Sequence, residues 1–317
     1  MGINLKVKIG RLQLNNPLMV ASGTFGYAEE FNDFMDLRQL GAIVTKTITL
    51  NPRQGNPPPR TCETPAGMLN SIGLENPGLE KFIQEKLPFL KKTAVPIIVS
   101  IASEGGNEEF VTLARQLDKV KEVSAIELNI SCPNVKVHSQ KFIVHSKKLR
   151  TRLISQDPKS TYALVKAVRR VTGKTLITKL SPNVTDIAEI ALAAQSGGSD
   201  AVSLINTLTA MSIDIESRKP RLGNVTGGLS GPAIRPVAVR MVWEVHQKIK
   251  IPIIGMGGIS DSLSALEFFL AGASAIAVGT ANFINPRTTL EIIDGIKKYL
   301  IKNKISSMKT LIGSLQI

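Results

Sequence analysis

The chain has 317 residues, of which 43% are hydrophobic, and its mean hydropathy of +0.10 reflects enough apolar material to bury a large core. No apolar run reaches the length that crosses a membrane, so we expect no membrane partner. The 39 Lys and Arg exceed the 25 Asp and Glu, for a net charge of +14, but only 4% of the residues are aromatic. Because no RNA-binding signature or zinc spacing accompanies that charge, we expect no nucleic-acid partner either.

Residues 1–14 alternate between apolar and polar side chains, as a strand does, and they lack the apolar stretch and cleavage site of a signal peptide. Two cysteines, Cys62 and Cys132, are too few for a disulfide framework in a chain of this length, which is typical of a reducing compartment. We therefore expect a cytoplasmic protein with an N-terminal hairpin, in which Cys132 is a free thiol.

Eight short apolar runs rich in β-branched residues follow one another along the chain, separated by helix-like segments. Their interiors are almost continuously apolar, as is typical of parallel strands buried on both faces. Eight such units predict an α/β fold, a (β/α)8 TIM barrel formed by one domain over residues 1–317, with small β insertions at its C-terminal rim. The predicted strands are residues 17–23, 41–47, 96–102, 125–131, 176–181, 201–206, 251–258 and 275–280.

The segments between these strands repeat their apolar residues with the 3.6-residue period of a helix. The clearest examples are residues 161–174, 235–249 and 262–273. Asp157 and Pro158, just before the first of them, are typical of an N-cap and a first-turn proline.

Polar residues or glycines stand at the C-terminal end of every predicted strand. Active sites of this fold form at that rim, so the eight strands direct their functional groups toward one mouth. These ends are Ser22–Gly23, Lys46–Thr47, Ser100, Asn129, Lys179, Asn206, Gly257–Gly258 and Gly279–Thr280.

The glycines after the seventh and eighth strands, in GMGGIS and AVGT, leave backbone N–H groups uncovered just before a helix. Such groups attract an anion, and the loops after strands 7 and 8 are the usual phosphate site of this fold. We therefore expect a phosphorylated ligand there, although the same glycines also suit turns that need a positive φ.

Lys46 and Lys179 are flanked by apolar strand residues, so each is expected to point a charge into the mouth, where it needs an anion. A Schiff-base role is open to a lysine at this place, but two lysines suit the stabilisation of negative charge better.

Four asparagines, Asn70, Asn129, Asn134 and Asn206, lie on the expected rim. An amide offers a donor and an acceptor in one plane, which suits a ligand with amide edges, although each could instead cap a turn. Together they suggest a cyclic imide or uracil-like substrate. No metal is expected, because none of the three histidines pairs with carboxylates at ligand spacing, and no Ser–His–Asp arrangement points to acyl transfer.

Cys132 follows the end of the fourth strand in NISCPNVK, on a rim loop close to lysines and asparagines. A cysteine that only fills the core would lie within a strand or on a helix face, so we predict a catalytic thiol. Cys62, in a proline-rich loop, is expected to be structural.

Nine motifs span nearly the whole chain: ASGTFGY, TKTITLNPRQGNPPPR, MLNSIGLENPG, ELNISCPNVK, TKLSPNVTDI, INTLTAM, GGLSGPAIRP, GMGGI and AVGTANF. Together they resemble the catalytic subunit of dihydroorotate dehydrogenase. The cysteine in NISCPN is similar to that of the class 1 enzymes, and TFGY and TITLNPRQGNPPPRT most resemble class 1B. The resemblance implies an FMN subunit that forms a homodimer core within a heterotetramer. A second subunit with FAD and a [2Fe–2S] cluster would pass the electrons to NAD+.

The resemblance also implies the site residues. The FMN phosphate would lie on Gly257, Gly258, Gly279 and Thr280, and the rest of the cofactor on Ser22, Lys46, Thr47, Ser100, Asn129, Lys179, Ile205 and Gly231. Ser100 stands where asparagine is common in the family. Dihydroorotate or orotate would be held by Lys46, Asn70, Ile72, Gly73, Leu74, Asn129, Asn134, Asn206 and Thr207.

The reaction that the resemblance implies is the oxidation of dihydroorotate to orotate in de novo pyrimidine biosynthesis. Cys132, as a thiolate, would remove a proton from the carbon next to a carbonyl while hydride leaves the neighbouring carbon for FMN. Lys179 would stabilise the negative charge of the reduced flavin, and Lys46 would offset the substrate carboxylate. An ordinary thiol has a pKa of about 8.5, so its surroundings must lower that value to give more than a few per cent thiolate at neutral pH.

Residues 137–156 depart from the family, which usually has a short glycine-rich loop here. This segment is longer, lacks glycine, and together with Lys136 carries six positive charges and no acid. We expect a mobile loop that closes poorly over the substrate and lowers the catalytic rate without affecting the fold. It is either an insertion specific to the lineage or the product of a locally shifted reading frame.

Three alternatives stay open. The chain could be a related FMN barrel, such as a dihydropyrimidine dehydrogenase domain, a fumarate-linked class 1A enzyme, or a nucleic-acid binder driven by charge. A flavin absorbance spectrum separates the nucleic-acid binder from the enzymes. Orotate production separates a dihydroorotate dehydrogenase from a related FMN barrel that acts on another pyrimidine.

Overall fold

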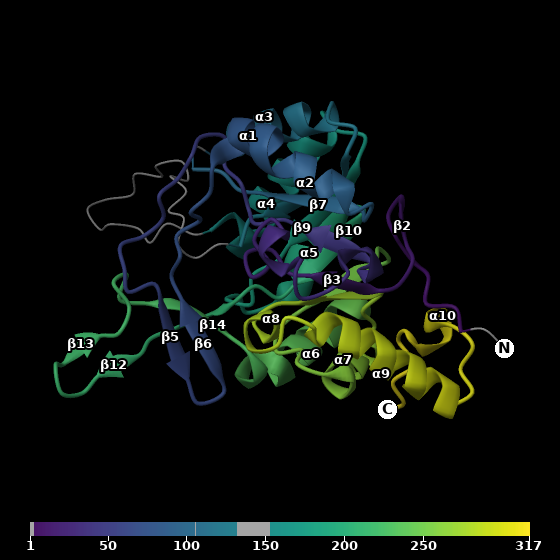
Figure 1. Ribbon diagram of the computed structural model, residues 1–317. Helices are drawn as coiled ribbons and strands as arrows, with labels where there is room; N and C mark the ends of the chain where they lie inside the picture. The colour runs from purple at the N-terminus through teal and green to yellow at the C-terminus, as the bar shows by residue number, and fades with distance from the viewer. Residues whose placement is uncertain (1–2, 105, 132–152) are drawn as a thin grey trace.

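Eight parallel strands close into a barrel in a computed structural model that describes residues 3–104, 106–131 and 153–317 (Figure 1). Around the barrel the strands follow the order β10-β15-β16-β3-β4-β7-β8-β9. Each of them overlaps one of the eight predicted runs, so the prediction of a (β/α)8 barrel is confirmed. Their bounds are β3 (Leu18–Val20), β4 (Ala42–Val44), β7 (Ile97–Ile101), β8 (Val123–Asn129), β9 (Thr175–Lys179), β10 (Ala201–Leu204), β15 (Ile253–Gly255) and β16 (Ala275–Val278).

Helices surround the barrel (Figure 1). The helix predicted after Asp157 begins at Pro158, and the Asp157 carboxylate accepts a hydrogen bond from the backbone N–H of Ser160 at 2.8 Å, as an N-cap should. The two other predicted helices are also present. The bounds are α1 (Gly78–Lys81), α2 (Leu87–Lys92), α3 (Asn107–Asp118), α4 (Pro158–Arg169), α5 (Ile187–Gly197), α6 (Arg235–His246), α7 (Ser262–Leu270), α8 (Ala281–Ile284), α9 (Thr288–Lys302) and α10 (Met308–Leu311). None of the helices in these described parts is long and apolar enough to cross a membrane.

The predicted N-terminal hairpin closes the end of the barrel opposite the mouth. Ile9 of β1 (Val7–Ile9) and Leu14 of β2 (Leu12–Leu14) pack into the apolar cluster that fills the barrel interior. The hairpin turns at Gly10, whose φ is +58°, and a Cβ there would come within 2.6 Å of the Asp200 Cβ. Only glycine therefore fits this turn without displacing Asp200.

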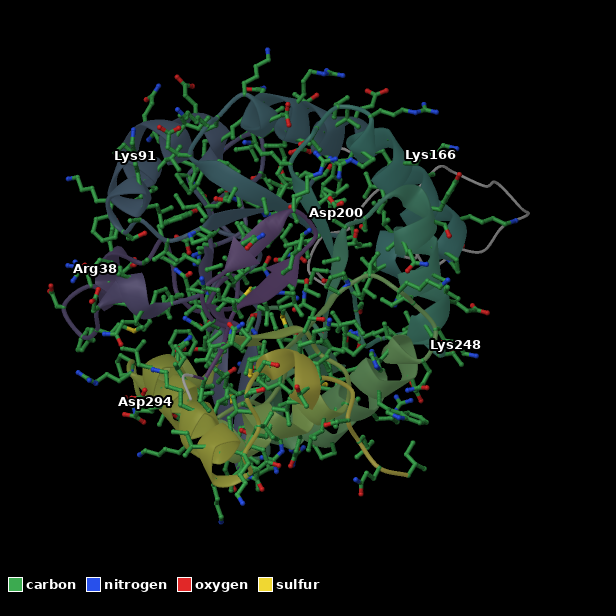
Figure 2. All side chains as sticks on the ribbon, turned by 90° about the vertical axis from the view of Figure 1, so that its right-hand side faces the viewer. Arg38, Lys91, Lys166, Asp200, Lys248 and Asp294 are labelled. Carbon is green, nitrogen blue, oxygen red and sulfur yellow. The ribbon has the colours of Figure 1, made fainter. Side chains whose placement is uncertain are left out.

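Figure 2 views the molecule from the side on which this hairpin lies. The labelled side chains of Arg38, Lys91, Lys248 and Asp294 lie around the outside of the view. Asp200 lies nearer the middle, where its carboxylate pairs with Arg169 at 2.8 Å and accepts from the backbone N–H of Leu176 at 2.8 Å. This end of the barrel is thus fixed by apolar packing and one ion pair, which is typical of the stability face of the fold.

Two small β insertions project from the other end, as predicted, and Figure 1 shows them on the left, away from the N-terminal hairpin. One is a four-stranded sheet in the order β11-β14-β6-β5, and the other is the hairpin β12-β13. The bounds are β5 (Thr61–Thr64), β6 (Gly67–Asn70), β11 (Leu208–Ala210), β12 (Ile213–Asp214), β13 (Lys219–Pro220) and β14 (Gly227–Ser230).

Cys62 lies in β5 opposite Leu69 of β6, so its prediction as a loop residue is wrong. The prolines that suggested a loop flank the strand, since Pro57, Pro58 and Pro59 precede Thr61 and Pro65 follows Thr64. A strand can form there because Thr61–Thr64 contain no proline, so each of these residues has a backbone N–H to donate.

The barrel interior changes from apolar to polar within one pleat of the strands. Ala125 of β8 and Ile177 of β9 belong to the apolar interior cluster. Two residues further along the same strands, Glu127 and Lys179 face the same side by alternation, and both are buried. The polar layer therefore lies directly below the mouth of the barrel.

Candidate active site

The C-terminal ends of the barrel strands and the rim sheet enclose a cavity of about 970 Å³. That volume lies at the upper end of the range typical of cofactor and substrate sites. The cavity brings together most of the residues predicted from the sequence: Ser22, Lys46, Thr47, Asn70, Ile72, Gly73, Leu74, Asn129, Lys179, Ile205, Asn206, Thr207, Gly231, Gly257, Gly258, Gly279 and Thr280.

Three predicted residues are not among those lining the cavity. Ser100 is fully buried in the polar layer, and it is connected to the cavity through its hydrogen bond with Thr47, which lines the cavity. Cys132 and Asn134 lie outside the described residues. Of the basic segment at 137–156, the structure describes residues 153–156 alone.

The glycine-rich ends of β15 and β16 present backbone donors at one side of the cavity. The N–H groups of Gly257, Gly258, Gly279 and Thr280 donate to no residue in the described part of the chain. A Cβ on Gly258, whose φ is +79°, would come within 2.8 Å of the Gly231 carbonyl oxygen, so the backbone can be this close only with glycine. A Cβ on Gly279 would meet no atom closer than 3.7 Å and would take up cavity space instead. This glycine cradle leaves room and donors for an anionic group such as a phosphate.

Two lysines supply positive charge to the same cavity. Lys179 is only 4% exposed, and Lys46 is half-buried. Neither ammonium forms a hydrogen bond or ion pair with another residue that the structure describes. Because an ammonium in such a place is costly without an anionic partner, the cavity is suited to a negatively charged ligand.

The hydroxyl of Thr47 is the centre of a buried hydrogen-bond network. It lies 3.0 Å from the Ser22 hydroxyl and 2.9 Å from the Ser100 hydroxyl, and it accepts from Asn129 Nδ2 at 3.1 Å. Ser100 in turn donates to the carboxylate of Glu127 at 3.1 Å. These contacts join β3, β4, β7 and β8 at their C-terminal ends and hold their side chains in fixed orientations.

A second branch fixes the amides. The Oδ1 atom of Asn129 accepts from the Ser131 hydroxyl at 3.1 Å, and Asn206 Nδ2 donates to that hydroxyl at 2.8 Å. The backbone N–H of Thr207 donates to Asn206 Oδ1 at 2.8 Å. Two amide planes are therefore held at the mouth, as recognition of a ligand with amide edges requires.

Residues 70–74 form a further wall, and contacts from outside the cavity hold it in place. The backbone N–H of Asn56 donates to the Ile72 carbonyl at 3.0 Å, and Arg53 Nε donates to the Gly73 carbonyl at 2.6 Å. Gly73 has a φ of +75°, so the wall includes a left-handed turn that these bonds stabilise. The stretch NPRQGN, which supplies both donors, therefore shapes the cavity without lining it.

The sequence reasoning missed Glu127 and Ser131, which connect the predicted site residues to one another. The signal for Glu127 was present, since it is the single charged residue in the apolar run AIELN. A charge in the interior of a buried strand needs partners and therefore marks a polar site. In the described part of the chain, no three His, Cys, Asp or Glu side chains come together as a metal site would need.

The family model described as dihydroorotate dehydrogenase matches residues 4–300 of this chain. Three similar proteins are each named dihydroorotate dehydrogenase B (NAD(+)), catalytic subunit. The one from Thermoanaerobacter pseudethanolicus is 51% identical over 315 residues, covering 99% of this chain and 100% of the relative. The one from Geotalea daltonii is 53% identical over 316 residues, or 99% of both chains. The one from Desulforamulus reducens is 50% identical over 317 residues, which is the full length of both.

Proposed function

The chain belongs to the dihydroorotate dehydrogenase family, and we propose that it is the catalytic subunit of an NAD+-linked, class 1B enzyme that oxidises dihydroorotate to orotate in pyrimidine biosynthesis. The observation that carries this proposal is the cavity at the barrel mouth, in which two lysines without a described anionic partner face two fixed amides. Dihydroorotate is a cyclic imide with a carboxylate, so it matches both features. The NAD-linked names of the full-length relatives favour this enzyme over the fumarate-linked class and over a dihydropyrimidine dehydrogenase.

The cavity fits FMN as the cofactor. The open space at Gly279 would hold its phosphate, together with the backbone donors of Gly257, Gly258 and Thr280, which have no partner among the described residues. Ser22, Lys46, Thr47, Asn129, Lys179, Ile205 and Gly231 would surround the rest of it. When bound, FMN would supply a two-electron acceptor for hydride, which no amino-acid side chain can provide.

The residues of the chain itself bind the substrate and move its proton. Lys46 would offset the substrate carboxylate, while Asn70, Asn129 and Asn206 would hold the imide edges. Cys132, which lies outside the described residues, would act as the general base. It follows Ser131, whose hydroxyl is bonded to both Asn129 and Asn206, so its point of attachment is next to the amides.

Lys179 would stabilise negative charge as it develops on the cofactor side of the cavity. Its ammonium is fixed at the end of β9 and is almost completely shielded from water, and in such a place a charge acts more strongly than in solution. Ile72, Gly73, Leu74 and Thr207 would complete the substrate wall, and Asn134 would join it from the part that is not described.

The word subunit in the names of the relatives supports a separate electron-transfer partner. We propose that this partner carries FAD and a [2Fe–2S] cluster and passes the electrons to NAD+, and that two copies of this chain form the core of a heterotetramer. The cytoplasmic location inferred from cysteine usage stays a prediction.

The test is to purify the full chain alone and together with its electron-transfer subunit. We expect a yellow protein with one FMN per chain, in which dihydroorotate reduces the flavin, and NADH formation from NAD+ only when both subunits are present. A colourless chain that takes up no added FMN would contradict the proposal. So would a chain whose flavin is reduced by dihydrouracil and not by dihydroorotate.

A further inference from the structure

Glu127 is a carboxylate buried inside the barrel, directly below the mouth. It lies in β8 between Ile126 and Leu128, which pack outward into the main core, and it is 1% exposed. It does not line the cavity. Burial of a carboxylate is costly unless hydrogen bonds or opposite charges compensate, so this residue needs a reason to be there.

Both oxygens of this carboxylate accept hydrogen bonds from serines on other strands. Ser100 of β7 donates to Oε1 at 3.1 Å, and Ser203 of β10 donates to Oε2 at 2.9 Å. Ser203 is the register partner of Lys179 on β9, the strand between β8 and β10. The carboxylate therefore connects β8 to β10, the strands on either side of β9, at the level of Lys179, which lines the cavity.

The carboxylate fixes the direction of the hydroxyl network above it. Because Ser100 donates its only hydroxyl hydrogen to Glu127, Thr47 must be the donor in its 2.9 Å contact with Ser100. Thr47 has then used its own hydrogen, so it accepts both from Asn129 Nδ2 and from the Ser22 hydroxyl at 3.0 Å. The chain runs one way, from Ser22 down to Glu127.

This direction determines what the mouth presents to a ligand. Ser22 lines the cavity, and its hydroxyl hydrogen is committed to Thr47, so its oxygen offers only lone pairs to the ligand. If the side chain at position 127 were neutral and able to donate, each hydroxyl of the chain could accept where it now donates. Ser22 could then donate its hydrogen to the ligand. The hydrogen-bonding character of a cavity residue thus depends on a charge three hydrogen bonds away.

We propose that Glu127 is a positioning residue for the cofactor. Its carboxylate orients the chain Ser100–Thr47–Ser22, and its negative charge lowers the reduction potential of the flavin bound above it. The proposal rests on the proposed function, because it takes a flavin as the occupant of the cavity. A negative charge in a region of low dielectric disfavours further negative charge nearby, and Glu127 in this way limits the effect of Lys46 and Lys179.

The test is the midpoint potential of FMN bound to the full chain, measured by anaerobic titration in the wild type and in Glu127→Gln. Glutamine keeps the size of the side chain and removes the charge, and its amide nitrogen can only donate, so one of the two serines has to reverse. We expect the equilibrium to move about tenfold toward reduced flavin, which is a positive shift of about 30 mV for a two-electron couple. A potential equal to that of the wild type, with normal flavin content, would overturn the proposal.

Two further variants distinguish the effect of the Glu127 charge from that of the hydroxyl chain and from a general loss of stability. Ser100→Ala keeps the carboxylate but interrupts the chain, so we expect a smaller positive shift, which also keeps the proposal testable if Glu127→Gln does not fold. Ser199→Ala removes a buried hydroxyl that is bonded to Thr178 on the outer face of β9, and it should lower stability without moving the potential. An unchanged potential in Ser100→Ala would overturn the role of the chain. A wild-type protein that binds no flavin would instead contradict the proposed function.

Discussion

The side-chain amide of Asn206 donates a hydrogen bond to the hydroxyl of Ser131 at 2.8 Å and thereby joins the end of β10 to the end of β8. Ser131 also donates to Asn129 Oδ1, so the three side chains form one unit at the mouth. Because Cys132 is the next residue in the chain, this unit fixes the point from which the proposed base starts. In the proposed reaction, the contact would therefore link substrate recognition to proton removal.

Asn206→Ala should weaken both functions. Loss of the amide leaves the Ser131 hydroxyl without the donor from which it accepts, and removal of one partner of a buried hydrogen bond costs about 1–3 kcal/mol. We expect a higher KM for dihydroorotate and a lower kcat, with kcat/KM reduced by about tenfold or more. Steady-state kinetics with Asn303→Ala, an exposed asparagine at the end of α9, provides the control. A change in kcat/KM no larger than that of the control would show that Asn206 does not contribute to substrate binding or to the reaction.

Cys132→Ala should leave FMN bound and slow its reduction by dihydroorotate by about 10²–10⁴-fold, because positioned bases contribute that much. The thiolate is the active form, so in the wild type the rate should rise with pH as the thiol ionises and level off above its pKa. Stopped-flow flavin reduction across a pH series measures both effects. Cys62→Ala is the matched control, since Cys62 lies in β5 and does not line the cavity. Fast, pH-dependent reduction in Cys132→Ala would show that another group is the base.

Gly258→Ala should release the cofactor. The new Cβ would come within 2.8 Å of the Gly231 carbonyl oxygen, and the backbone at φ +79° is unfavourable for alanine. We expect FMN affinity to fall by about tenfold or more, which corresponds to about 1.4 kcal/mol. Gly198→Ala is the control, because Gly198 also has a positive φ, +104°, but caps α5 and does not line the cavity. If both variants retain the same amount of flavin, the glycine cradle does not hold the phosphate.

Lys179→Met should shift the flavin potential in the direction opposite to Glu127→Gln. Removal of a positive charge beside the cofactor disfavours the reduced, negatively charged flavin, so the midpoint potential becomes more negative and reduction by dihydroorotate slows. Lys174→Met, just before the other end of the same strand, is the control. Its ammonium donates to the carbonyls of Val120 and Val123, and its loss should affect stability alone. A potential in Lys179→Met that equals the wild-type value would exclude the proposed electrostatic role.

The barrel could be predicted because each strand carries its own local pattern. An apolar run such as PIIVSIA predicts β7 (Ile97–Ile101) without knowledge of its neighbours, and the polar residue that ends such a run predicts the rim. A short rim strand such as β5 (Thr61–Thr64) has no apolar run, so its sequence predicts a loop at Cys62. The four residue pairs that β5 forms with β6 depend on the partner strand and not on the sequence of β5 alone.

The connections within the site could not be predicted, because they depend on register between distant segments. Glu127 is bonded to Ser100 across 27 positions of sequence and to Ser203 across 76. Asn70 of β6 contacts the Gly228 carbonyl across 158 positions. Which side chains meet is decided once the barrel has closed, so the sequence indicates the members of the site but not the order in which they are bonded.

The buried hydroxyl of Tyr27 is expected to weaken the fold. Its side chain packs against Phe82, the residue is 7% exposed, and its hydroxyl is buried without a hydrogen-bond partner in the described part of the chain. Burial, and to a lesser degree the charge of Glu30, raises the pKa of Tyr27 well above its usual value. The phenol is therefore held neutral in a place that offers it no compensation for the loss of water.

Tyr27→Phe should raise the free energy of unfolding at neutral pH by about 1 kcal/mol, because it removes an unsatisfied polar group and keeps the ring. The difference in unfolding free energy between the variant and the wild type should be larger at alkaline pH. Since the pKa of Tyr27 is raised in the folded state, unfolding releases its proton once the pH exceeds the unfolded value of about 10, so the wild type loses stability there and the variant does not. Urea unfolding at about pH 7 and about pH 10.5 measures both effects, with Tyr162→Phe as an exposed control. A lower unfolding free energy for Tyr27→Phe at both pH values would mean that the hydroxyl has a stabilising partner after all.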